Sequence, residues 1–469
     1  MNSNPLKKCF LFLAFLPAWA HALAAKPPIP EAQQQARLLA FKPEDSKSLD
    51  LSLPDNALLE AIAKDTWVYF RDLVDRENGI PIDNVLVAGA QSRVGSFTST
   101  TNIGLYLMSV AGAVEFGLIS PGEAQARIRL VLLTLNKLDH WRGQYFNYYE
   151  TITLDVSRRF ASSVDNGWLA AGLIVARQSF PTLAQDIDRI LEEMDFSRFY
   201  DPEIGQLWGG FDAAQNKPST NHYGLLCTEP RIASYIGIAK GDLPREHWYR
   251  LFRVLPDEWD WQNQKPQGQL RTIGGQDVFY GTYSHNGIRY VPSWGGSLFE
   301  FLMPNLVLDE QQLSKRGLGA NNLIALNAQI HYALQERRYP AWGMSPCATP
   351  DSQQGYKEYG VPYLGAKGYP DEGVVTPHVS FLALMVDAPQ AIENIRRLAR
   401  MKGLYGPYGF YDSVNVRTGR ASARFLALDQ SMTFISIVNY LKNGAIQKRF
   451  LSYPPIQEQL DLLRDEVFF

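Results

Sequence analysis

The sequence predicts an all-α protein, an (α/α)6 toroid or barrel with long aromatic-rich loops on one rim. Apolar residues recur at helical spacing in twelve segments of the 469-residue chain, and several of these segments are paired through short linkers. The stretches between pairs are long and rich in Gly, Tyr, Trp and Asn, which is typical of functional loops. The alternative is an α-solenoid, which needs a repeat of roughly 34–47 residues. The sequence shows no such repeat.

The chain opens with a segment typical of a secretory signal peptide. Lys7 and Lys8 precede a short apolar stretch, and small residues that follow it offer cleavage sites. We therefore expect residues 1–25 to be removed by cleavage near 22–25, and the protein to be periplasmic or secreted. Residues 26–54, rich in Pro and Gln, are expected to form an N-terminal extension. No later apolar run approaches the roughly 20 residues that cross a bilayer.

One domain is expected to span residues 55–445, with 446–469 as a C-terminal tail packed on it. The first helix begins at Asp55, since the apolar residues that follow share one helical face. The other eleven helices are predicted at 102–116, 121–138, 165–178, 182–194, 229–240, 244–252, 297–307, 320–336, 377–386, 389–401 and 428–441. The five long loops are 143–164, 196–228, 253–296, 338–376 and 403–427.

Charge and composition exclude several classes of protein. The chain carries 45 basic and 48 acidic side chains, a net charge of -3, which argues against a nucleic-acid binder because such proteins need a cationic surface. With 46% apolar and 12% aromatic residues, global disorder is not expected. Beyond the expected cleavage site, Cys227 and Cys347 either form a disulfide or remain free and buried. The sequence does not indicate an oligomeric state.

The common motifs for metals, phosphates and serine nucleophiles are absent. The seven histidines form no local pair with metal-ligand spacing. Gly360 and Gly365 have P-loop spacing, but Ala366 stands where the lysine belongs. Phe299 replaces the last glycine of a nucleophile elbow that would begin at Gly295. We therefore expect no metal site and no organic cofactor.

Carboxylates among aromatic residues are the remaining signal. They lie in the long loops and at the helix starts that follow, at 147–150, 163–165, 221–229, 294–300, 369–373 and 428–430. Glycoside cleavage needs two carboxyl groups, one to protonate the leaving oxygen and one to attack or to activate water, while sugar rings stack on Trp and Tyr. From composition alone, a non-catalytic glycan-binding toroid is an equal alternative.

At these residues the sequence resembles the glycoamylase-like domain. The resemblance covers about residues 55–445 in unshuffled order, and its blocks lie at 66–70, 100–107, 162–167, 228–231, 239–242, 247–248, 293–304, 359–362, 371–378 and 408–412. This domain acts as a transglycosylase in cyclic β-1,2-glucan synthases and is related to bacterial endo-β-1,2-glucanases. The resemblance implies an (α/α)6 barrel that acts on β-1,2-glucan or its oligosaccharides, while charge and hydropathy predict no nucleic-acid partner and no integral membrane segment after signal removal.

The resemblance also implies the catalytic pair. Glu229 is the expected proton donor, and Glu300 is the expected nucleophile or base. Hydrolase-type glucanases carry a glutamate just before their Ser-x-x-Asp block, where this chain has Phe160. This difference favours the synthase-type branch and leaves hydrolysis and transglycosylation both open. A carboxyl separation of about 5–5.5 Å would indicate retention of configuration, and about 6.5–9.5 Å inversion.

Ten further residues are candidates for substrate contact: Tyr149, Glu150, Asp165, His222, Tyr223, Arg231, Trp294, Asp371, Glu372 and Asp429. Several also have a structural interpretation. Asp165 suits an N-cap, and Asp429 suits an anchor at a helix start. Glu229, directly before Pro230, also suits a carboxylate stabilised by the positive end of a helix.

The predicted function is a β-1,2-glucanase or a transglycosylase of β-1,2-glucan. The alternatives are a non-catalytic factor for glucan binding or assembly, and a glycosidase of another linkage, because (α/α)6 barrels serve many glycans.

Overall fold

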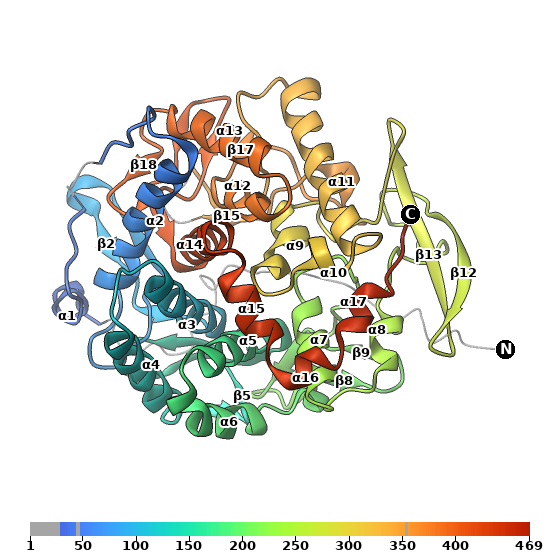
Figure 1. The fold of residues 1–469 in the computed structure, drawn as a ribbon, viewed down its shortest axis with the longest axis horizontal. Helices are drawn as coiled ribbons and strands as arrows, with labels where there is room; N and C mark the ends of the chain where they lie inside the picture. Colours follow the sequence, from blue (N-terminus) through green and yellow to red (C-terminus); the bar gives the residue numbers. More distant parts are fainter. Residues whose placement is uncertain (1–28, 44–46, 352–354) are drawn as a thin grey trace.

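The computed structural model describes residues 29–43, 47–351 and 355–469. The predicted signal peptide, residues 1–25, lies outside them. Helices dominate, and short antiparallel strands lie between them (Figure 1). The prediction of a helix-rich fold is confirmed. The expectation of an all-α protein is wrong, because the segments between helices pair locally into small sheets.

Six helices are buried on nearly all sides, as expected for helices that are apolar around their whole circumference. They are α3 (Thr100–Glu115), α5 (Ser163–Ser179), α7 (Arg231–Ala239), α9 (Leu298–Leu302), α12 (His378–Leu382) and α14 (Ala427–Leu441). Helix α3 packs on α5 and α14, α5 packs on α7, and α12 packs on α9 and α14. Arg231 of α7 donates to the carbonyl oxygens of Glu300 and Phe301 in α9, at 3.2 and 2.7 Å. The six helices therefore contact one another in a cycle.

A second helix packs on each of the six buried helices. Helix α2 packs on α14, α4 on α3, α6 on α5, α8 on α7, α11 on α9 and α13 on α12. These outer helices are α2 (Asp55–Asp72), α4 (Pro121–Leu135), α6 (Ala184–Glu193), α8 (Glu246–Arg250), α11 (Leu318–His331) and α13 (Ala388–Ala399). Each of the twelve predicted helices thus coincides with one observed helix, with boundaries shifted by a few residues.

The remaining helices are shorter. They are α1 (Glu31–Ala36), α10 (Glu310–Leu313), α15 (Ala445–Leu451), α16 (Pro454–Gln457) and α17 (Leu460–Arg464). Helix α15 packs on α3, α5 and α14, and α16 packs on α7, so the C-terminal segment crosses the ends of several buried helices (Figure 1).

The strands form small sheets within the segments expected as loops. One sheet has the order β11-β10-β7-β6-β3, two have three strands in the orders β2-β1-β22 and β17-β20-β21, and three pairs are β4-β5, β8-β9 and β18-β19. A further pair is β15-β16, and a long hairpin with a third strand is β12-β13-β14. Their bounds are β1 (Asn84–Leu86), β2 (Arg93–Val94), β3 (Phe97–Thr98), β4 (His140–Trp141), β5 (Gln144–Tyr145), β6 (Asn147–Glu150), β7 (Val156–Ser162), β8 (Tyr200–Asp201), β9 (Gln206–Leu207), β10 (Gly210–Asp212), β11 (Lys217–Pro218), β12 (Gln267–Ile273), β13 (Gln276–His285), β14 (Ile288–Tyr290), β15 (Cys347–Ala348), β16 (Tyr356–Lys357), β17 (Val374–Val375), β18 (Tyr405–Gly406), β19 (Gly409–Phe410), β20 (Val414–Asn415), β21 (Arg420–Ala421) and β22 (Arg424–Leu426).

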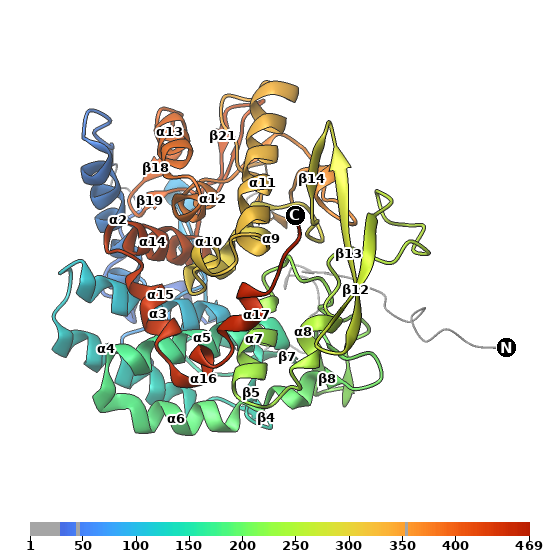
Figure 2. The ribbon, with the colours of Figure 1, turned by 45° about the vertical axis from the view of Figure 1, so that its right-hand side comes forward.

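The β12–β13 hairpin stands at the edge of the molecule, as Figure 2 shows. Ile273 pairs with Gln276 across Gly274 and Gly275, whose φ angles of 58° and 76° suit a tight two-residue turn. The base of the hairpin is anchored by the C-terminal segment, since the Tyr280 hydroxyl donates to Glu466 at 3.1 Å.

Cys227 and Cys347 are both free and buried. Of the two alternatives for these thiols, the unpaired one is therefore confirmed. Among the described residues, no helix combines the length and the apolar character needed to cross a membrane.

Candidate functional site

A cavity lies where the first turns of four buried helices meet the strands between them. It encloses about 1030 Å³ of empty space, counting its open mouth. Its lining comes from the starts of α3, α5, α9 and α14, from Glu229 before α7, and from the strand segments: Asp83, Asn84, Phe97, Ser99, Thr101, Asn102, Tyr148, Val164, Asp165, Trp168, Glu229, Phe299, Met303, Ala348, Gly355, Tyr356, Arg424, Leu426 and Leu428.

Glu229 points into this cavity from the turn that begins α7. The N–H of Ile232 donates to the Glu229 carbonyl, so the backbone of Glu229 already belongs to the first turn. The side chain is only 2% exposed, and among the described residues its Oε2 has no hydrogen-bond partner. Burial, followed by the nearby charge of Glu300, raises the pKa of Glu229 to about 8. Glu229 is therefore protonated at neutral pH.

Glu300 does not itself line the cavity, and in contrast to Glu229 both of its carboxylate oxygens accept hydrogen bonds. Helix α9 begins with a capping box, in which the Ser297 hydroxyl accepts from the Glu300 N–H while the Glu300 carboxylate accepts from the Ser297 N–H at 3.0 Å. The hydroxyls of Ser293 and Ser297 also donate to Oε2, at 2.8 and 2.9 Å, and the Gly295 N–H donates to Oε1 at 2.9 Å. Burial raises the pKa of Glu300, but these donors oppose the rise because they stabilise the charged form.

Two further side chains lie close to the glutamates. The Tyr369 phenol is largely buried, and its pKa is raised first by that burial and then by the charges of Glu300, Glu358 and Glu229. The pKa of Glu358 is also raised, chiefly by burial, with the charge of Glu300 adding to the effect. The ring of Tyr369 lies on Gly295, where an added Cβ would fall 2.0 Å from the ring carbons. Gly295 therefore allows Tyr369 to approach the loop that holds Glu300.

Asp165 lies on the wall next to Glu229. It accepts from the Thr101 hydroxyl at 2.6 Å and from the Asn147 amide at 2.8 Å. The N-cap interpretation of Asp165 is wrong, because Ser162 caps α5 and accepts from the Asp165 N–H. The side chain is instead free to face the cavity. Tyr223 lies nearby, with burial and the charges of Asp165 and Glu229 raising the pKa of its phenol.

Three predicted contact residues are structural in this fold. Tyr149 has no exposed surface, and its hydroxyl donates to Asp139 and accepts from Phe146. His222 stacks on Trp208 with ring centroids 3.7 Å apart, and its Nε2 lies 2.9 Å from Asp201.

Arg231 is the third, fully buried in an ion pair with Glu310 at 2.8 Å. None of these three side chains is among those that line the cavity.

Four more predicted contacts lie away from the cavity lining. Trp294 is buried at 4% exposure. The Asp371 carboxylate binds the hydroxyls of Tyr332 and Tyr339 at 3.0 Å. Glu372 forms an ion pair with Lys357 at the surface. Glu150 is hydrogen-bonded to Ser96 and Ser157, and neither glutamate lines the cavity.

The structure adds residues that the sequence analysis did not single out. Asp83 accepts from the amides of Asn84 and Asn102, at 2.9 and 2.8 Å. Tyr148 packs edge-on against Phe97, with centroids 5.3 Å apart, and both rings line the cavity. The alternation of side chains along a strand could have predicted that only one of Tyr148 and Tyr149 faces the cavity, because neighbouring side chains in β6 point to opposite faces.

Fold and cavity together define the class of molecule. It is a helix-rich protein whose aromatic-walled cavity holds a protonated carboxyl, with a second carboxyl close enough to raise its pKa. A buried carboxyl that stays protonated can act as a proton donor, and a nearby carboxylate held by hydrogen-bond donors can act as a nucleophile or base.

Family models match two parts of this chain. Residues 260–454 match a family described as "Putative glucoamylase", and residues 61–229 match one described as a protein of unknown function, DUF3131. The chain is 26% identical to the cyclic beta-(1,2)-glucan synthase NdvB of Rhizobium meliloti, over 87% of this chain and 18% of the synthase. It is 22% identical to an exo beta-1,2-glucooligosaccharide sophorohydrolase of Parabacteroides distasonis, over 88% of this chain and 58% of that enzyme. This chain thus spans less than two thirds of either relative.

Solved structures share the fold. One is described as a putative glucoamylase from Bacteroides fragilis, with a TM-score of 0.70 and 20% identity, covering 89% of this chain and 98% of that one. Another is an endo-beta-1,2-glucanase from Chitinophaga pinensis, with a TM-score of 0.67 and 20% identity, covering 88% and 98%. Together, these similarities confirm the resemblance to the glycoamylase-like family.

Proposed function

We propose that this protein is a glycoside hydrolase or transglycosylase acting on β-1,2-glucan, and more specifically a β-1,2-glucanase. The protonated, buried Glu229 at the cavity wall is the observation that carries the chemistry. The substrate class is supported by the names of the relatives, two of which act on or make β-1,2-linked glucans.

We propose that the twelve helices form an (α/α)6 toroid. The closed cycle of six buried helices, each covered by one outer helix, supports this architecture. The N-terminal ends of the inner helices then share one rim, which explains why Glu229, Asp165 and Glu300 meet although they are distant in sequence.

In the proposed reaction, Glu229 donates its proton to the glycosidic oxygen as the bond breaks. Glu300 attacks the anomeric carbon or activates a water molecule. The donors that surround Oε2 of Glu300 hold the carboxylate in one orientation and favour its charged form. The rings of Tyr148, Trp168 and Tyr356 offer apolar faces for sugars.

We also propose that residues 55–445 form the catalytic domain and that the chain is exported. Both proposals rest on the sequence patterns, since the expected signal segment lies outside the described residues. The tail from residue 446 follows the start of α15, which packs on buried helices.

The proposal is tested by incubating residues 26–469 with linear β-1,2-glucan and separating the products by chromatography. We expect short oligosaccharides, or longer and cyclic products if transfer dominates. Parallel incubations with β-1,3-, β-1,4- and β-1,6-glucans should leave those polymers intact. Cleavage of one of these polymers instead of β-1,2-glucan would change the proposed substrate linkage but keep the proposed class of glycoside hydrolase. Binding of β-1,2-glucan without any product would favour a non-catalytic glucan-binding protein.

The activity should fall at alkaline pH. Since Glu229 must be protonated to act as the acid and its pKa is about 8, kcat should be lost with a slope of about one log unit per pH unit as the pH rises through 8. A pH–rate profile on β-1,2-glucan measures this limb. A descending limb near pH 4–5, the ordinary range of a glutamate, would contradict the role assigned to Glu229.

A further inference from the structure

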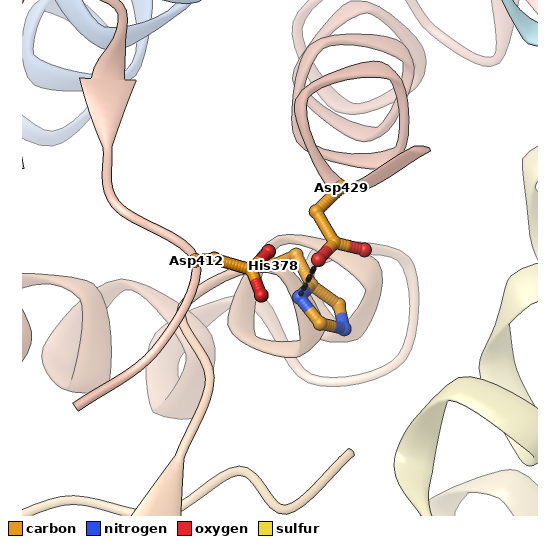
Figure 3. A group of neighbouring side chains, drawn as sticks. All are labelled: His378, Asp412 and Asp429. Atoms are coloured by element: carbon orange, nitrogen blue, oxygen red, sulfur yellow. Dashed lines mark ion pairs between the residues drawn. The ribbon is translucent and has the colours of Figure 1, made fainter. Parts of the chain in front are cut away.

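Three buried side chains converge, as Figure 3 shows. His378 begins α12, Asp429 lies in the first turn of α14, and Asp412 lies between β19 and β20. One ligand-type atom from each residue lies within 4.8 Å of the others. Their exposed fractions are 2%, 3% and 2%, so bulk water cannot solvate the group.

The atoms that face one another are unsatisfied. His378 Nδ1, Asp412 Oδ1 and Asp429 Oδ2 have no hydrogen-bond partner among the described residues. Buried polar atoms almost always have a partner in native proteins, and each exception calls for an explanation such as an ion. Here, three exceptions point at the same place.

His378 and Asp412 each make a hydrogen bond through their other polar side-chain atom, which holds the side chain in place. The Ser345 hydroxyl lies 3.0 Å from Nε2 of His378, which leaves Nδ1 directed at the carboxylates. The Ala348 N–H donates to Oδ2 of Asp412, which leaves Oδ1 directed at His378. Metal-binding imidazoles and carboxylates are typically held in this way by a second hydrogen bond.

The group brings two carboxyls together with one imidazole. Burial raises the pKa of both Asp412 and Asp429; Asp412 adds to the rise at Asp429, whereas Asp429, the Ala348 N–H and Arg424 oppose it at Asp412. Asp83 adds a further negative charge on the cavity side. His378 contributes an imidazole nitrogen, which can bind a metal ion through its lone pair.

We propose that His378, Asp412 and Asp429 bind one divalent transition-metal ion, for which Zn²⁺ is the best fit. One imidazole nitrogen and two carboxylate oxygens are ligands that Zn²⁺ accepts. Ligands about 2.1 Å from a tetrahedral ion lie roughly 3.4 Å apart. The distance from His378 Nδ1 to Asp429 Oδ2 is 3.4 Å.

The site is distinct from the proposed catalytic pair. The ion would connect α12, α14 and the segment between β19 and β20, and the residues adjacent to its ligands, Ala348 and Leu428, line the cavity. Its role is therefore to fix the part of the cavity wall formed by Ala348 and Leu428. The competing explanation is a proton shared between the two aspartates, which also satisfies two buried carboxyls.

The test uses residues 26–469 dialysed against a chelator and then titrated with ZnCl2 by calorimetry. We expect saturable binding of one Zn²⁺ per chain and a rise in melting temperature that chelator reverses. Parallel titrations with MnCl2 and CaCl2 should show weaker binding, because Ca²⁺ prefers six or more oxygen ligands.

Variants locate the ion. His378→Gln and Asp412→Asn should each weaken Zn²⁺ binding at least tenfold. His331→Gln is the matched control, since His331 pairs with Glu336 at the surface, and it should leave binding unchanged. Absence of saturable binding to the wild-type protein, or unchanged affinity in well-folded cluster variants, would overturn the proposal and leave the shared proton. Zn²⁺ binding by the wild-type protein is measured without any substrate. Its outcome can therefore be distinguished from the outcome of the glucan-cleavage test.

Discussion

Replacing Glu229 with Gln should lower kcat on β-1,2-glucan by at least about 10³-fold. The amide has nearly the same shape, but it cannot donate a proton to the leaving oxygen, and general acid catalysis contributes about 10²–10⁴-fold. The loss should appear in kcat rather than in KM, because the side chain still fills the same space in the cavity. Initial rates of oligosaccharide release measure both quantities.

The matched control for this change is Glu192→Gln. Glu192 is an exposed residue at the end of α6, far along the chain from the cavity lining, and its replacement should leave kcat within about twofold. Circular dichroism and glucan binding should be normal for both variants. Retention of more than a tenth of the wild-type kcat by a folded Glu229→Gln protein would refute the acid assignment.

Replacing Arg231 with Met should lower the free energy of unfolding by about 3–5 kcal/mol, because it leaves Glu310 buried without its counter-ion. Arg231 and Glu310 are fully buried and joined by two hydrogen bonds, at 2.8 and 2.9 Å. The same guanidinium binds carbonyl oxygens in α9, so the substitution also loosens the contact that closes the cycle of buried helices. Urea unfolding monitored by tryptophan fluorescence gives the change.

Arg245→Met provides the comparison for this variant. Arg245 pairs with Asp461, but their side chains are 38% and 48% exposed, and exposed pairs contribute about 1 kcal/mol or less. If both substitutions lowered stability equally, the buried pair would have no special role in closing the cycle.

The helices were predictable because their signal is local. The buried helices are long apolar runs and the outer ones have periodic apolar faces, so each could be recognised within its own segment. The strands were missed because most contain two or three residues, too few to show a period of two. A few of their partners also lie far away in sequence, as when Asn84 pairs with Leu426.

The site was predictable only in part. Glu229 and Asp165 lie at helix starts, where the sequence pattern placed them. Trp294 and His222 were expected to contact sugar because aromatic residues in loops often do, but these long segments fold back and bury some of their own rings. Whether a loop aromatic faces the core or the cavity depends on contacts that one sequence does not reveal.

The group of His378, Asp412 and Asp429 illustrates the same limit for metal ligands. Motif searches rely on ligands that are close in sequence, whereas these three come from separate segments brought together by the packing of α12 on α14. The expectation of no metal site rested on local spacing alone.

The arrangement of the buried helices also has an evolutionary consequence. The helix bodies serve mainly packing, while most of the side chains that reach the cavity come from a first turn or from a segment between helices. Insertions and deletions in these segments can therefore reshape the cavity walls while the helices keep their places. Such a separation lets one scaffold diversify among glycans of different linkage and length through changes confined to its connecting segments.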